Sequence, residues 1–197
     1  LRQRLGEAGL VVEKVDPALG RILDLVKTRE AEGYSYDTAQ ASFEVLARRE
    51  LGLCPEFFDV KRYKVSVERR KNKYNRMVSL SEAVVVVRIN GEKKMSVSES
   101  MDELGNDRGP VNALSKALAK DLGPYQKMID DMSLVDYKVR ITQGGTEAVT
   151  RVVIDCEDSK GRCWSTVGVS ANIVDASFEA LLDAINWKLI RDTGQRA

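Results

Sequence analysis

The stretch Tyr63-Lys64-Val65-Ser66-Val67 decides the fold, because it returns later in the chain as Tyr137-Lys138-Val139-Arg140-Ile141. Two further pairs of segments repeat in the same order. Ser81-Glu82-Ala83-Val84 returns as Thr146-Glu147-Ala148-Val149, and Gly109-Pro110-Val111-Asn112-Ala113-Leu114 is echoed by Asn172-Ile173-Val174-Asp175-Ala176-Ser177. Each set is typical of a strand, a strand and a helix. The duplication therefore predicts two equivalent units that face each other across a pseudo-twofold axis, with a cleft suited to a small molecule.

Apolar periodicity predicts the elements of both units. Alternation predicts strands over residues 57–67, 83–89 and 94–100 in the first unit, and over 134–142, 148–156 and 162–169 in the second. Asn90-Gly91 is a two-residue hairpin signal. Helical spacing begins near Val111 and again over 174–191. We expect two tandem βββα units, 56–124 and 132–192, with mostly antiparallel sheet and helices on one side.

The first 55 residues have a different pattern. Asp16-Pro17 is a strong helix start, and Gly33 ends that helix; a second helix is expected from near Asp37 to Gly52. Such short helices cannot bury much core alone. The predicted fold is therefore α+β, with a helical linker subdomain over residues 1–55 and a second domain over 56–197. The chain opens in mid-helix, which suggests a piece of a longer protein.

Composition narrows the possible functions. The 197 residues carry a net charge of +1 and no histidine. Without imidazole there is no histidine base, histidine metal ligand or Ser/His pair, so we expect no metal, no cofactor and no catalytic residue here, although carboxylate or lysine catalysis stays open. The near-neutral charge argues against a nucleic-acid partner, and no apolar run can span a bilayer, so we expect no membrane partner and a cytoplasmic protein. The cysteines are expected to be reduced, although Cys156 and Cys163 could face each other across a hairpin.

Three groups of residues are candidates for chemistry. The glycine-rich segments 105–110 and 168–172 precede helices, whose free amides could hold the carboxylate of a zwitterionic ligand. Asp136 lies within an apolar strand and could balance a ligand ammonium or lie on the exposed face. The basic segment 68–76 could contact phosphate or nucleic acid through Tyr74, but a solvated hairpin tip is the favoured interpretation. Trp164 and Trp187 are expected to be core or interface anchors.

Several of these segments resemble a known family. Leu134-Val135-Asp136-Tyr137-Lys138-Val139-Arg140, Gly109-Pro110-Val111-Asn112-Ala113-Leu114 and Trp164-Ser165-Thr166-Val167-Gly168-Val169-Ser170-Ala171-Asn172-Ile173 closely resemble the C-terminal regulatory domain of 2-isopropylmalate and citramalate synthases. Glu32-Gly33-Tyr34-Ser35-Tyr36-Asp37 resembles the linker subdomain that precedes it. The resemblance covers nearly the whole chain, and its details lean towards the citramalate synthase branch.

The resemblance implies a feedback-regulatory part of an acyltransferase that condenses acetyl-CoA with a 2-oxo acid. The catalytic barrel, with its divalent metal, belongs to the rest of the parent chain, so this chain alone should be inactive. The resemblance also implies a homodimer that binds isoleucine or leucine near its interface; a structural dimerisation module without a ligand is the alternative. Tyr34 and Tyr36 are candidates for relaying the signal. By motif, the expected ligand site consists of Gly109, Pro110, Val111, Val135, Asp136, Tyr137, Ala148, Gly168 and Ile173.

Overall fold

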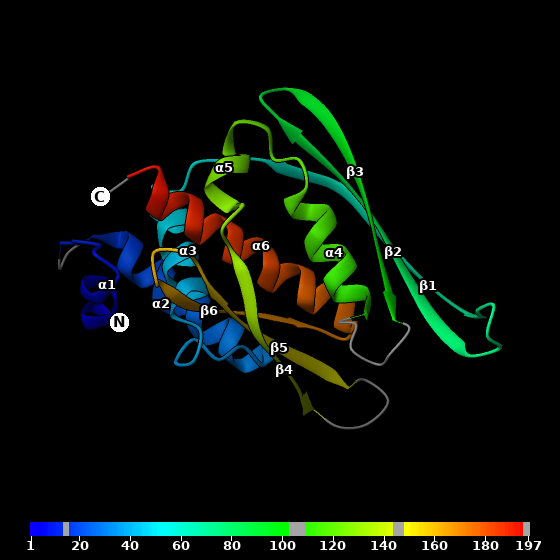
Figure 1. Ribbon diagram of the computed structural model, residues 1–197. Coiled ribbons are helices and arrows are strands. Elements are labelled where there is room, and N and C mark those ends of the chain that lie inside the picture. Colours follow the sequence, from blue (N-terminus) through cyan, green and yellow to red (C-terminus); the bar gives the residue numbers. More distant parts are fainter. Residues whose placement is uncertain (14–15, 103–108, 144–147, 195–197) are drawn as a thin grey trace. The chain divides into compact units, whose positions relative to one another are not determined.

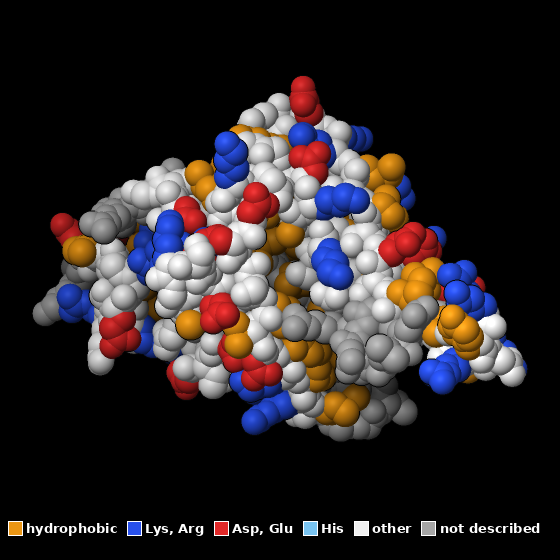
Figure 2. Space-filling model, viewed as in Figure 1, with side chains coloured by type: hydrophobic (Ala, Val, Ile, Leu, Met, Phe, Trp, Pro, Cys, Tyr) orange, Lys and Arg blue, Asp and Glu red, His pale blue; other side chains and the backbone are white. Residues whose placement is uncertain are grey.

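The computed structural model describes residues 1–197 except 14–15, 103–108, 144–147 and 195–197 (Figure 1). The chain divides into two compact units. The central unit is Glu56–Asp130. The composite unit joins Leu1–Pro55 to Asp131–Ala197. Charges of both signs are interspersed on the surface shown in Figure 2, in keeping with the net charge of +1.

The central unit is an antiparallel sheet of three strands with one main helix. Its elements are β1 (Asp59–Lys71), β2 (Met77–Ile89), β3 (Glu92–Asp102), α4 (Gly109–Ala119), a 3-10 turn (Gly123–Tyr125) and α5 (Gln126–Ile129). Strand β2 is in the middle. Asn90 and Gly91 both have positive φ, 50° and 86°, as the tight hairpin between β2 and β3 requires. Helix α4 buries Ala113, Leu114, Ala117 and Leu118 against the sheet.

The composite unit repeats the same order. Strands β4 (Ser133–Gln143), β5 (Val149–Glu157) and β6 (Cys163–Ser170) form an antiparallel sheet with β5 in the middle, and α6 (Ile173–Asp192) packs on β5 and β6. Ile154 lies opposite Tyr137 on one side and Thr166 on the other. The Thr166 hydroxyl donates to the Ala180 carbonyl of α6 at 2.8 Å. The predicted α+β fold with two tandem βββα units is confirmed.

The N-terminal helices α1 (Arg2–Glu7), α2 (Pro17–Glu32) and α3 (Gln40–Glu50) complete the composite unit. The Asp16 side chain caps α2 by accepting from the Ala18 amide at 2.8 Å, with Pro17 in the first turn as predicted. Helix α3 is buried along its whole middle, Ala41–Arg48. The Ser42 hydroxyl accepts a hydrogen bond from the Val167 amide of β6 at 3.0 Å. Residues 1–55, expected to form a linker subdomain, therefore share a hydrophobic core with the β6 strand.

Candidate functional site

The sequence-predicted ligand residues belong to both units. Gly109, Pro110 and Val111 lie at the start of α4 in the central unit, and all three are partly exposed. Gly109 has φ +60°, and no atom lies within 4 Å of the position that a Cβ would take. The backbone conformation, rather than a lack of space, therefore favours glycine there. The other six candidates, in the composite unit, are Val135, Asp136, Tyr137, Ala148, Gly168 and Ile173.

Tyr137 connects strand β4 to the first turn of α6. Its hydroxyl is 2.7 Å from the Ser177 hydroxyl, and Ser177 in turn donates to the Ile173 carbonyl at 2.6 Å. Burial raises the pKa of the Tyr137 phenol. The ring is thus a neutral, half-buried group held against the start of the helix, and the structure connects two of the predicted residues, Tyr137 and Ile173.

An apolar patch continues from Tyr137 along the same face of β4. Val139 and Ile141 follow at alternate positions, so their side chains lie on the Tyr137 face. They are 41% and 70% exposed, and Ile173 at the start of α6 is 44% exposed. We call Val139, Ile141 and Ile173 the β4 patch. It offers apolar contact area beside a fixed phenol, a combination that suits an aliphatic side chain.

Gly168 lies at a close contact between helix and strand, and Asp136 forms an ion pair. A Cβ on Gly168 would lie 1.9 Å from the Ala176 carbonyl oxygen, so this glycine allows the α6 backbone to approach β6 closely. Asp136 lies on the exposed face of its strand. The hydrogen bonds that it accepts from Lys138, at 2.7 Å, and from the Tyr137 amide lower the pKa of its carboxyl. Of the two roles considered for Asp136, the structure supports the exposed one.

Tyr34 of the linker contacts α6 through Glu179. The Tyr34 hydroxyl donates to the Glu179 carboxylate at 2.7 Å, and the same carboxylate accepts from Arg29 at 3.2 Å and from the Val169 amide of β6 at 3.1 Å. Tyr36 is 1% exposed, and its ring stacks on that of Tyr34 with centroids 5.9 Å apart. Burial raises the pKa of Tyr36 to about 12. The sequence did not predict a role for Glu179. The one feature that could have indicated it is the position of this acidic residue between the buried residues Phe178 and Ala180.

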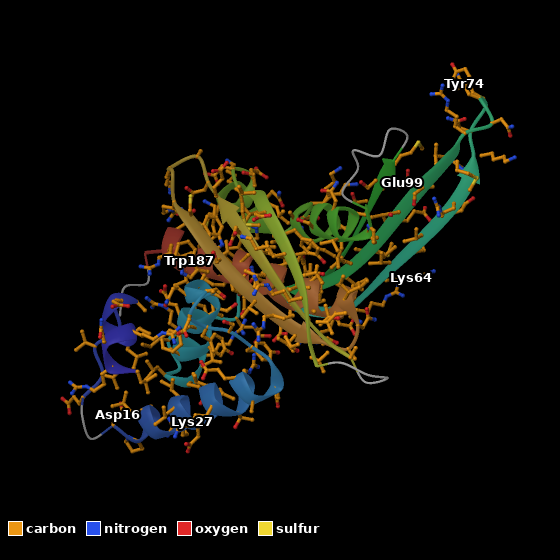
Figure 3. All side chains as sticks on the ribbon, turned by 90° about the horizontal axis from the view of Figure 1, so that it is seen from below. Asp16, Lys27, Lys64, Tyr74, Glu99 and Trp187 are labelled. Atoms are coloured by element: carbon orange, nitrogen blue, oxygen red, sulfur yellow. The ribbon has the colours of Figure 1, made fainter. Side chains whose placement is uncertain are left out.

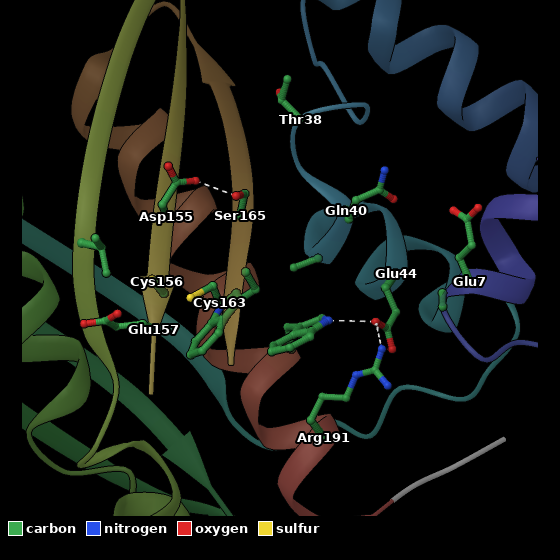
Figure 4. Close-up of a pocket in the computed structure, with 15 residues that line it drawn as sticks. Glu7, Thr38, Gln40, Glu44, Asp155, Cys156, Glu157, Cys163, Ser165 and Arg191 are labelled. Carbon is green, nitrogen blue, oxygen red and sulfur yellow. Dashed lines mark hydrogen bonds and ion pairs between the residues drawn. The ribbon is translucent and has the colours of Figure 1, made fainter. Parts of the chain in front are cut away.

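A cleft of about 610 Å³ lies between α1, α3, the start of β6 and the end of α6 (Figure 4). Trp164 and Trp187 stack there with centroids 5.0 Å apart, as expected of anchors between sheet and helix. The Trp187 indole donates to the Glu44 carboxylate at 2.8 Å, and Arg191 donates to it at 2.6 Å. These contacts satisfy Glu44, which is 3% exposed.

The cysteines are free. Cys156 lies opposite Trp164, and Cys163 lies opposite Glu157, so the two occupy adjacent positions of the β5–β6 register. Side chains at adjacent positions point to opposite faces of a sheet. This explains why Cys156 is buried and Cys163 exposed. The pairing that the sequence left open is therefore not formed.

The basic segment 68–76 forms the far end of the β1–β2 hairpin. Its strands continue through Lys71 and Met77, and Tyr74 lies at the tip (Figure 3). Tyr74 is 68% exposed, and the Lys73 ammonium lies 5.0 Å from the centre of its ring. This is the solvated tip that the sequence favoured. Within the described ranges, no group of three or more Cys, Asp or Glu side chains could hold a metal ion, and no described helix is long and apolar enough to cross a membrane.

Comparison with known proteins assigns the domain. Residues 37–189 match the model of the LeuA allosteric (dimerisation) domain. The chain belongs to this family. It is 39% identical over 194 residues to an (R)-citramalate synthase of Aquifex aeolicus and 40% identical over 185 residues to one of Geobacter sulfurreducens. These matches cover 98% and 93% of the chain but 35% and 33% of the relatives.

A more distant relative carries a second enzyme name. The chain is 30% identical over 189 residues to a 2-isopropylmalate synthase of Clostridium kluyveri, a match that covers 96% of the chain and 31% of that protein. The chain thus spans about a third of the length of the curated relatives that it matches. Its higher identity to the citramalate synthases agrees with the branch that the sequence motifs favoured.

Proposed function

We propose that this chain is the feedback-regulatory part of an acetyl-CoA-dependent 2-oxo acid acyltransferase, a citramalate or 2-isopropylmalate synthase. The family and the names of the relatives support this assignment. Condensation takes place in the remainder of the parent protein, which supplies the barrel and its divalent metal. The parent belongs to branched-chain amino-acid biosynthesis in the cytoplasm, and the domain acts as a homodimer.

The effector is a branched-chain amino acid, isoleucine in preference to leucine. The observation that carries this proposal is the β4 patch beside Tyr137 at the start of α6. Burial of a branched four-carbon side chain there contributes about 2 kcal/mol. Amide groups at the start of α6, beside Ile173, supply donors for the carboxylate. These two terms alone correspond to an affinity of about 1 mM, so tighter binding requires further contacts with the ligand.

The signal leaves the site through Glu179. This carboxylate binds the Val169 amide, near the end of β6, and the Tyr34 hydroxyl of the linker. A ligand that shifts the first turn of α6 therefore changes the hydrogen bonds of Tyr34 and the stacking of Tyr36. We propose that these two tyrosines carry the change from the regulatory fold into the linker.

Calorimetric titration of the chain with isoleucine and leucine tests the proposal. Isoleucine should bind, and Ile173→Ala and Ile141→Ala should each weaken binding about tenfold through lost apolar contact. Val11→Ala is the matched control, because Val11 is 96% exposed and belongs to the same unit. If neither amino acid produces heat at millimolar concentration, the sensor proposal fails.

A structural dimerisation module is the second candidate. Met95, Val97 and Met101 of β3 alternate with buried Ser96 and Ser100, so they lie on the face opposite α4. They are 65%, 41% and 46% exposed. Exposed Glu99 lies between Val97 and Met101 on the same face, so a second copy of the chain would meet apolar and charged side chains there. Dimerisation in sedimentation, combined with no amino-acid binding, would favour this candidate over the first.

A further inference from the structure

The face of the β4–β5–β6 sheet that points away from α6 carries three cations. Lys138 and Arg140 alternate along β4 with Tyr137 and Val139, and Tyr137 reaches α6, so the two cations lie on the opposite face. Arg151 of β5 lies directly opposite Arg140 in the register. Like charges directly opposite each other destabilise a sheet. An arginine pair at this position therefore needs an explanation.

Neighbouring carboxylates neutralise the lysine but not the arginines. The Lys138 ammonium lies 2.7 Å from Asp136 and 2.8 Å from Asp155. Arg151 uses its Nε to donate to the Gly33 carbonyl of the linker. Across the described ranges, neither Arg140 nor Arg151 forms an ion pair with a carboxylate. Two guanidinium groups thus retain donors and charge.

These cations line one side of a cleft of about 500 Å³. Its lining comes from the linker and the sheet and consists of Ser35, Thr38, Lys138, Arg140, Arg151, Val153, Asp155 and Ser165. Three of these residues, Thr38 of the linker and Asp155 and Ser165 of the sheet, are labelled in Figure 4. The linker wall is fixed in place, because Gly33 packs against β4: a Cβ on Gly33 would lie 2.9 Å from the Thr142 hydroxyl.

The linker side of the cleft adds neutral donors. The Thr38 hydroxyl donates to the Ser35 carbonyl at 3.2 Å and lies 3.4 Å from the Ser35 hydroxyl. Two guanidinium groups and a hydroxyl are together typical of sites for tetrahedral oxyanions.

We propose that this cleft is a phosphate site, occupied by inorganic phosphate or by the phosphate group of a small phosphorylated molecule. Lys138, Arg140 and Arg151 together with Asp136 and Asp155 carry a net charge of +1. The two guanidinium groups offer several charged donors, which suit the many oxygens of a phosphate better than the two of a carboxylate. Arg140 and Arg151 bind phosphate oxygens with charge-assisted hydrogen bonds, and the Ser35 hydroxyl binds a further oxygen. The site is separate from the β4 patch, which lies on the other face of the sheet.

Titration of the chain at constant ionic strength, above the second pKa of phosphate, tests the proposal. Inorganic phosphate and glycerol phosphate are the two probes, and acetate is the monoanion. We expect Arg140→Gln to weaken phosphate binding at least tenfold, and Arg140→Lys, which keeps the charge without the planar fork, to weaken it less. Arg62→Gln, an equal charge change at an exposed residue of β1, should leave binding within twofold.

The outcomes separate the alternatives. Tighter binding of glycerol phosphate identifies a phosphate ester as the ligand, and binding of inorganic phosphate alone identifies the free ion; both support the site. The proposal is overturned if neither probe binds at millimolar concentration, if Arg140→Gln binds as tightly as the parent chain, or if acetate binds as tightly as phosphate. Isoleucine binding, measured separately, does not enter this result.

Discussion

The two βββα units differ in the outer face of their sheet, which is the face that points away from the helix of the unit. In the central unit, the sheet face away from α4 is apolar and bare at Met95, Val97 and Met101. In the composite unit, the face away from α6 has Val153, Val167 and Val169 packed against the linker helices, and cations beside them. The two units are thus alike on the helix-covered side of the sheet and differ on the outer side. One outer face holds the linker, and the other exposes Met95, Val97 and Met101.

The two units also differ in how deeply their lysine–aspartate ion pairs are buried. Lys188 of α6 is fully buried, with its ammonium 2.9 Å from Asp131 and 3.0 Å from both Asp158 and Asp192. In the central unit, Lys94 pairs with Asp121 at 3.0 Å, but both side chains are partly exposed. Burial therefore makes the same pair of residue types far more important in the composite unit.

The largest expected effect comes from Lys188→Met. Removal of the ammonium takes the buried cation away from Asp158 and Asp192 and leaves Arg162 and Lys160 as their cationic partners, so the composite unit should lose about 3 kcal/mol. Lys94→Met is the matched control and should cost less than about 1 kcal/mol. Circular dichroism follows both units during urea unfolding, and tryptophan fluorescence follows the composite unit, because both tryptophans of the chain belong to it. Similar losses in the two variants would contradict the comparison.

Gly168→Ala is expected to rank second. The added Cβ meets the Ala176 carbonyl oxygen, and backbone of a packed helix cannot rotate away, so the cost should be about 2–3 kcal/mol. Gly109→Ala has open space and suffers only from its positive φ, at about 1 kcal/mol. Unfolding curves by circular dichroism and fluorescence compare the two. Equal stability of Gly168→Ala and the parent chain would remove the close-approach argument.

A pH dependence should distinguish the composite unit further. Burial raises the pKa of Asp183 to about 6, with Arg49, Ser42, Glu179 and Arg29 around it. A carboxyl whose folded-state pKa is raised binds its proton more readily in the folded state. Stability should therefore rise by about 2 kcal/mol as the pH falls from about 6 to about 4.

Asp192 acts in the opposite direction at lower pH. Although burial opposes the charge, hydrogen bonds from Lys160, Arg162 and Lys188 lower its pKa to about 2. The ionised Asp192 side chain therefore stabilises the folded state at pH values above the ordinary pKa of aspartate, and this stabilisation is lost as the pH falls from about 4 to about 2. The fluorescence-detected stability should thus peak near pH 4. Asp183→Asn should remove the rise and keep the acid loss; a variant that retains the rise would refute the assignment.

The smallest expected effect concerns the third strands. Val97→Thr on the bare face of β3 should change stability by less than about 0.5 kcal/mol. Val167→Thr on β6, where valine is 1% exposed against the linker core, should cost about 1–2 kcal/mol. Denaturant midpoints give both values. Sedimentation of Val97→Thr also tests whether this face is the proposed dimer contact, because a weaker dimer is expected only if it is.

Local patterns predicted the elements well, for a physical reason. Asn90-Gly91, Asp16-Pro17 and the strand alternation each act over a few residues, and the structure has the turn, the cap and the six strands. The β1–β2 hairpin is longer than expected, because Glu68 and Lys71 still pair with Leu80 and Met77. The short helix α5 was missed, since Gly123-Pro124 was interpreted only as a helix end.

Contacts between distant segments were not predictable in this way. No local pattern shows that Lys188 meets Asp131 and Asp158, or that Glu179 receives Tyr34. Gly168 was chosen for its place before a helix, yet its packing role depends on a carbonyl eight residues away. Of the candidate site, the sequence predicted Tyr137 and Ile173, and the structure added Ser177, which connects them.

The close approach at Gly168 has a mechanical consequence. No side chain lies between the backbone of α6 and strand β6 at this point, so no rotamer change can absorb a displacement of one against the other. We therefore expect α6 and β6 to move together as one rigid body. At 1.5 Å per residue, the 20 residues of α6 make this helix about 30 Å long. A displacement of the first turn of α6 should therefore also displace Trp187 and Arg191 near its other end. These two residues donate hydrogen bonds to Glu44 of the linker.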